Sequence, residues 1–182
     1  IDSTRQWQLA GGTLKDITVS GGGDVLKPFQ ITSASGTLDN VTLGWNTTVQ
    51  VGNVGSGNQV TVLNGLTLAN NRLLRLDRSN VSSSGIYDVG LNFGGIQTLG
   101  GSGVVELFST TSNGTARIRP TGGGTLTIGS GITVRNATNS ALTTLGDAAG
   151  GSLVIAGKVL AQSTGQTLRV TGATVTNTGI FE

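Results

Sequence analysis

Three residue types are missing from this 182-residue chain: cysteine, histidine and methionine. Without cysteine there is no disulfide, no thiolate nucleophile and no thiolate metal ligand. Without histidine there is no imidazole ligand and no Ser–His catalytic pair. These absences exclude the most common zinc sites and the most common mechanisms of nucleophilic hydrolysis.

Proline, aromatic residues and long hydrophobic runs are also scarce. The chain has 2 Pro and 4% aromatic residues, and no run of about 18 apolar residues, the length that crosses a bilayer as a helix. Charge is nearly balanced, with 11 basic against 9 acidic residues. A surplus this small is a poor basis for binding nucleic acid. We therefore expect no nucleic-acid partner and no membrane insertion.

An apolar–Thr–apolar triplet recurs in a background rich in Gly, Leu, Val and Ile, a composition that favours strands. In a strand the outer two residues of each triplet face one way and Thr faces the other. We therefore expect an inward ladder and an outward Thr ladder. The inward ladder comprises Ile17, Val41, Leu66, Ile132 and Ala173, and the outward one Thr18, Thr42, Thr67, Thr133 and Thr174.

A repeat of about 20–30 residues that carries short strands and no helix signal indicates a solenoid. Stacked coils bury a continuous core and pair each strand with its equivalents above and below. A β-sandwich or barrel also has short, evenly spaced strands, but it does not explain the return of one residue type at one position. The predicted fold is an all-β parallel β-helix (β-solenoid) of about seven coils. It covers residues 1–182 as a single domain or a segment of a longer array, with an irregular register from about 81 to 124.

The triplets and the Gly-rich corners between them resemble the right-handed parallel β-helices of bacterial autotransporter passenger domains and filamentous-haemagglutinin-like adhesins. Asn often stacks at a corner in those families, and Asn70, Asn136 and Asn177 each lie two residues after a triplet. The resemblance implies a right-handed β-helix that is secreted or held at a bacterial cell surface. The lack of cysteine, of an initiating Met and of a signal peptide fits a mature or excised extracellular segment.

Candidate binding residues are few. The densest charge is the motif RLLRLDR, in which Arg72, Arg75 and Arg78 form a candidate surface for acidic glycans. Solvated charges on a coil explain this motif equally well. Trp45 is a candidate platform for a sugar ring. The motif RIR, from position 117 to 119, is a weaker candidate of the same kind.

The acidic residues are too scattered for a glycan-cleaving active site. Glycoside hydrolysis usually requires two converging carboxylates, and no two Asp share a short motif or one coil position. Lys15 and Asp39 lie at equivalent positions of neighbouring coils, which predicts an exposed ion pair. We predict a protein that is not an enzyme, with no catalytic residue, cofactor or metal. A polysaccharide-binding or polysaccharide-degrading β-helix (a lyase or hydrolase) is the alternative.

The ends of the expected solenoid carry the functional hypothesis. A solenoid exposes unpaired strand edges at both ends unless they are capped. Neither terminal sequence has the pattern of a cap, and TGIFE followed by IDSTRQWQL continues the apolar alternation. We predict a structural or adhesive extracellular rod, stalk or filament. Its partners are copies of itself stacked end to end or further coils of the same chain, with glycans or a host surface as additional candidates.

Overall fold

A computed structural model describes residues 6–21, 27–50, 57–79, 87–110, 114–138, 140–162 and 164–182. The regular elements in these ranges are all β-strands, and none of the described residues forms a helix that could span a membrane. The strands are β1 (Gln8–Leu9), β2 (Thr13–Ser20), β3 (Phe29–Ile31), β4 (Thr37–Gly44), β5 (Thr47–Gln50), β6 (Asn58–Arg78), β7 (Val89–Ser109), β8 (Ala116–Ile128), β9 (Ile132–Asn136), β10 (Leu142–Gly146), β11 (Ser152–Ile155), β12 (Lys158–Leu160), β13 (Thr167–Thr171), β14 (Val175–Asn177) and β15 (Ile180–Phe181).

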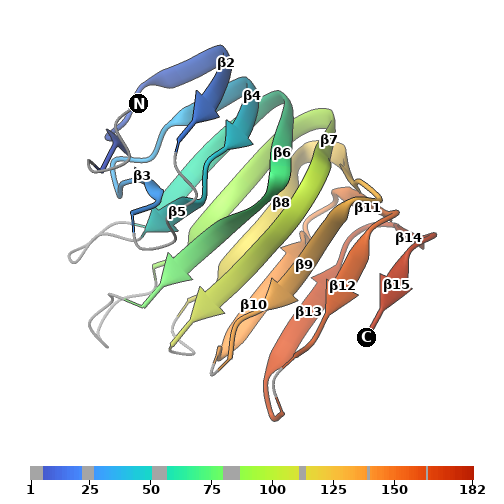
Figure 1. The fold of residues 1–182 in the computed structure, drawn as a ribbon. Coiled ribbons are helices and arrows are strands. Elements are labelled where there is room, and N and C mark those ends of the chain that lie inside the picture. Colours follow the sequence, from blue (N-terminus) through green and yellow to red (C-terminus); the bar gives the residue numbers. More distant parts are fainter. Residues whose placement is uncertain are drawn as a thin grey trace.

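The strands pair in parallel and stack into three columns, which confirms the predicted all-β solenoid. Column 1 holds the starts of β2, β4, β6, β7 and β8, and then β10 and β13. Column 2 holds the following parts of those five strands, and then β11 and β14. Column 3 holds β1, β3, β5, the ends of β6 and β7, and then β9, β12 and β15. The termini lie at opposite ends of this stack (Figure 1).

The number of full turns is about five, slightly below the seven predicted. From β6 onward, five successive strands give column 1 at least five residues each. The two N-terminal turns are shorter there. In them, column 1 is reduced to three paired residues before the backbone turns at Asp16 and Asn40, which both have positive φ.

The repeat length is uneven, which explains the irregular register expected for residues 81–124. Leu66, Leu99, Ile128 and Ile155 are successive register partners in column 2. They are 33, 29 and 27 residues apart (66 to 99, 99 to 128, 128 to 155). Residues 81–86 lie outside the described part of the chain, but most of 89–109 pairs with the turns on both sides, the longest interruption being 94–98 on the β6 side.

A single aliphatic core runs through the stack because buried and partly exposed residues alternate along each strand. In β9, for example, Ile132 and Val134 are buried while Thr133 between them is partly exposed. Removing apolar surface from water in this way contributes about 25 cal/mol per Å². The core residues are therefore what holds successive turns together, in addition to the parallel backbone hydrogen bonds.

The predicted ladders hold for the first three triplets only. Ile17, Val41 and Leu66 are register partners, and so are Thr18, Thr42 and Thr67.

The last two triplets were assigned wrongly. Ile132 and Thr133 pair with Gly103 and Val104 in column 3 instead of column 2. Ala173 and Thr174 precede β14 and are not part of it. In β14 the column 2 position equivalent to Leu66 is occupied by Asn177. The triplet is a general strand pattern that occurs in two columns, so its sequence cannot identify the column.

The three asparagines do not form one ladder. Asn70 lies at an exposed corner with φ 57°, a conformation that Asn tolerates well. Asn136 ends β9 and is fully buried, where its Oδ1 accepts a hydrogen bond from the Gln162 N–H at 2.8 Å. Asn177 is exposed and forms a local turn with Gly179. The prediction of a shared Asn corner is wrong, because the three residues follow different columns or corners.

Candidate binding site

The RLLRLDR motif does not form the predicted open basic surface. Arg72 is half-buried, and its Nε donates to the Gly44 carbonyl oxygen at 3.1 Å. Arg78 is fully buried and donates to the Tyr87 carbonyl oxygen and to Ser109 Oγ. Burial lowers the pKa of Arg78, an effect that nearby Asp88 opposes. Both guanidinium groups donate hydrogen bonds to backbone carbonyl oxygens. The sequence pattern does not reveal these contacts.

Arg75 faces outward in column 3, but acidic residues surround it. It forms ion pairs with Asp77 at 2.9 Å and with Glu106, and lies 4.3 Å over the ring of Phe108. Glu106 also pairs with Arg135 of the next turn at 2.8 Å. The result is a ladder of alternating charge across three turns, which stabilises the stacking without leaving a basic patch.

Trp45 is not an exposed sugar platform. Its side chain is 1% exposed and belongs to the core, so this prediction is wrong. Gly21 lies directly over the ring, because a Cβ at that position would come within 2.0 Å of Trp45 Cδ2. A small residue distant in sequence thus covers the indole, and no local signal indicates that.

The predicted ion pair between Lys15 and Asp39 is present at 3.0 Å. The Asn64 side chain donates to Asp39 at 2.6 Å, so three successive turns are linked at this edge. Hydrogen bonds from Asn64 and then from Lys15 hold the pKa of Asp39 below its usual range. The same contact raises the pKa of Lys15. These groups therefore strengthen the packing of the N-terminal turns.

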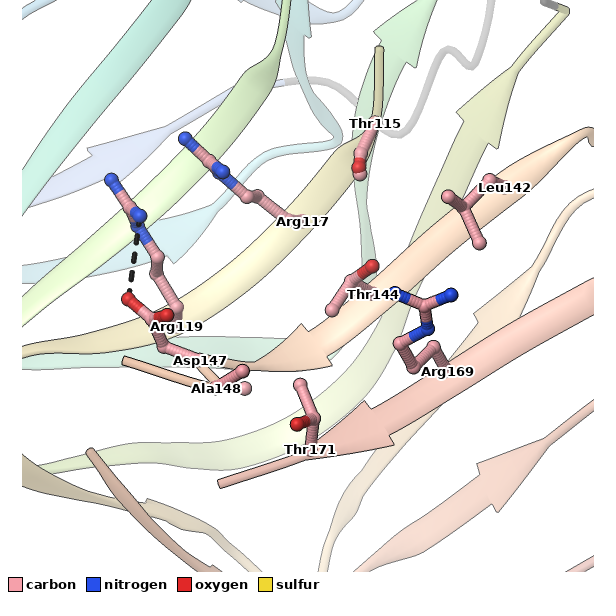
Figure 2. A pocket seen from close by; sticks show the side chains of 10 residues that line it. Thr115, Arg117, Arg119, Leu142, Thr144, Asp147, Ala148, Arg169 and Thr171 are labelled. Carbon is pink, nitrogen blue, oxygen red and sulfur yellow. Dashed lines mark hydrogen bonds and ion pairs between the residues drawn. The ribbon is translucent and has the colours of Figure 1, made fainter. Parts of the chain in front are cut away.

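A basic hollow on the outer face of column 1 is the clearest candidate site. Its volume is about 260 Å³, and Figure 2 shows the side chains around it. Arg117, Thr144 and Arg169 are register partners in three successive turns, so they form one outward row across the sheet. Gly146 and Thr171 are likewise paired and lie two residues further along their strands.

The middle turn of this face carries small residues while the turns on either side carry long ones. Thr144 and Gly146 belong to β10, with arginines on β8 before it and Arg169 on β13 after it. Parallel strands lie about 4.8 Å apart, so a missing side chain in one turn leaves a trough between its neighbours. The hollow follows directly from this large–small–large order.

The charge around the hollow is not fully balanced. Arg117 pairs with Asp88 at 3.0 Å, and Arg119 pairs with Asp147 at 3.3 Å. Arg169 is exposed and has no hydrogen bond or ion pair with any described residue. Three guanidinium groups therefore face two carboxylates, and one cation is available to a ligand.

Burial acts against the charge of Arg117. Desolvation lowers the pKa of its guanidinium, the Asp88 carboxylate partly reverses this, and the neighbouring Arg119 lowers it further. Its Nε is buried and makes no hydrogen bond within the described ranges. An additional negative charge nearby would favour the charged form of this arginine.

Neither the hollow nor the rest of the described chain has the features of a metal site. No group of three or more His, Cys, Asp or Glu side chains converges among the described residues. The two carboxylates near the hollow each pair with an arginine. The hollow is lined by arginine, threonine and small residues, with one guanidinium more than the carboxylates beside it.

The two ends of the solenoid form a second kind of surface, which is apolar. At the N-terminal end, Trp7, Leu14 and Ile17 contribute to a hollow of about 270 Å³. Ile17 is 44% exposed although its register partners Val41 and Leu66 are buried. At the C-terminal end Val175 and Phe181 are 41% and 48% exposed, although their register partners Leu153 and Val159 are buried. These side chains have the core pattern but have no further turn to cover them within the described residues.

Comparison with known proteins identifies no relative: no family, no curated protein and no solved structure matches this chain. Sequence reasoning noted Arg117 and Arg119 but missed Arg169. Aligning Arg169 with Arg117 requires the register of β8, β10 and β13, and the uneven repeat length hides that register.

Proposed function

We propose that this chain is a structural element: a length of rigid β-solenoid rod that extends by pairing end to end with copies of itself. The observation that supports this is the strand edge at each end of the stack that has no partner among the described residues. β2 is paired with β4 on one side and has no described partner on the other. At the far end, within the described ranges, β14 pairs only with β11 and β15 only with β12.

The direction of the strands fixes the direction of such assembly. Every strand pair in the described part of the chain is parallel. Two N-terminal ends brought together would place their strands antiparallel, whereas an N-terminal end on a C-terminal end continues the same parallel columns. Heterologous contact of this kind does not close on itself and yields a linear filament.

The apolar side chains at the two ends support the same contact. Ile17 at one end, and Val175 and Phe181 at the other, occupy inward positions of the core but remain 41–48% exposed. Exposed strand edges and apolar side chains together favour association with another sheet edge. The repeat pattern and the lack of cysteine support a place for such a rod outside the cell or at a bacterial surface.

Sedimentation velocity over a range of concentrations tests the proposal. The unaltered chain is expected to form species that lengthen with concentration. Val175→Lys places a charge at an inward position of the terminal strand β14 and is expected to leave mainly monomer. Ile96→Lys is the matched control because Ile96 is 88% exposed midway along the stack, and it should assemble as the unaltered chain does. An unaltered chain that stays monomeric at every concentration would overturn the proposal.

A further inference from the structure

We propose that the hollow on column 1 binds a single anionic group, a carboxylate or a sulfate, carried by an acidic polysaccharide. The anion would rest over Thr144 and Gly146, with the Arg169 guanidinium as its main partner. Arg117 and Arg119, each paired with a carboxylate, line the opposite side (Figure 2). This inference concerns the flank of the rod and does not depend on end-to-end assembly.

The floor of the hollow is fixed by the backbone. Gly146 has φ +104°, and a Cβ there would lie 1.7 Å from the Thr171 carbonyl oxygen of the next turn. No residue with a side chain can occupy this position without moving a backbone that pairs on both sides of β10. The backbone of the sheet therefore keeps the space above β10 free of a side chain at position 146.

Arg169 is the residue best placed to hold an anion. A guanidinium presents a planar fork of N–H donors that matches the two oxygens of a carboxylate or sulfate. The two other arginines of the hollow already have carboxylate partners, at 3.0 Å and 3.3 Å. Among the described residues, Arg169 is the arginine of this group with all of its donors available, and the excess positive charge attracts the ligand.

The remaining lining suits a sugar. Thr144 and Thr171 place two hydroxyl groups around the hollow, and each hydroxyl both donates and accepts hydrogen bonds. Leu142 adds an apolar contact. A polynucleotide would require a long basic surface, whereas the whole chain has a net charge of only +2. One anionic group beside neutral hydroxyls is the pattern of a uronate or a sulfated sugar.

The test measures binding of the full chain to immobilised polygalacturonate and dextran sulfate, at about 0.15 M salt so that nonspecific charge effects are screened. Neutral dextran and single-stranded DNA serve as comparison surfaces. Binding to either acidic polysaccharide above both comparison surfaces is expected, and which of the two binds identifies the anion. Binding to neither, or equal binding to DNA, would overturn the proposal.

Three variants locate the binding on the chain. Arg169→Gln removes the free guanidinium and is expected to weaken binding about tenfold, the effect of one lost charge-assisted hydrogen bond. Thr144→Leu fills the floor without changing charge and should weaken binding similarly. Lys158→Gln removes one positive charge in column 3, away from the hollow, and should bind as the unaltered chain does.

Far-ultraviolet circular dichroism confirms that each variant is folded. Both altered residues of the hollow are at least partly exposed, so neither substitution disturbs the core. Equal loss in Lys158→Gln and Arg169→Gln would show that only overall charge matters and would overturn the assignment of the site.

Discussion

Glu106 links three successive turns on the outer face of the solenoid. It accepts contacts from Arg75 of the preceding turn and Arg135 of the following one, and it is only 8% exposed. Water screens such a pair less than an exposed one, and loss of the central charge leaves two cations facing each other. At the scale of single residues, outward-facing ion pairs therefore hold neighbouring turns together, in addition to the apolar packing of the core.

Glu106→Gln is expected to lower the free energy of unfolding by about 1–3 kcal/mol, because two charge-assisted contacts become weaker and the two arginines repel. Urea unfolding measures the change. Glu182→Gln makes the same substitution in an exposed pair with Lys158 and should leave the unfolding midpoint nearly unchanged. Equal effects of the two substitutions would contradict a special role for Glu106.

At the scale of strands, the first three turns could be predicted because their spacing is regular. Ile17, Val41 and Leu66 are 24 and 25 residues apart, and their strands pair in the predicted register. After Leu66 the spacing rises to 33 residues and then falls, so a fixed period loses the register. Ile132 was consequently placed in the wrong column, although its burial was predicted correctly.

The same loss of register explains which site residues could be predicted. The pairing of Lys15 with Asp39 lies within the regular region and followed from the sequence. Burial of Trp45 beneath Gly21 and of Arg78 beside Tyr87 depends on contacts between corners, which have no periodic signal. Arg169 lines the hollow because β10 pairs with β13. The regular repeat in the sequence ends before these strands and does not predict that pairing.

Gly146→Ala is expected to destabilise the fold by about 3 kcal/mol or more, since it combines an unfavourable positive φ with a clash against backbone. Gly150→Ala is the matched control, because Gly150 also has positive φ (+125°) but a Cβ there meets nothing within 4 Å. Its effect should be limited to about 1–2 kcal/mol of backbone strain. Thermal or urea unfolding compares the two, and equal losses would show that contact between β10 and β13 is looser than described.

At the scale of the whole molecule, the parallel stack has two different ends and one repeated cross-section. Each column ends in an unpaired edge among the described residues, and the inward residues there remain partly exposed. A copy added in the same direction would place its column 2 on column 2 of the first chain. In that register Asn177 of one copy lies beside Ile17 of the next, as Ile155 lies beside Asn177 within the chain.

Directional cross-linking tests this account most directly, because the chain contains no cysteine of its own. Adjacent parallel strands are about 4.8 Å apart, which is within the range that a disulfide spans. Ile17→Cys and Asn177→Cys, prepared separately and mixed under mild oxidation, are expected to yield disulfide-linked dimers in the mixture. Each variant alone should yield few. No dimer in the mixture, or equal dimer in either variant alone, would contradict head-to-tail extension of the rod.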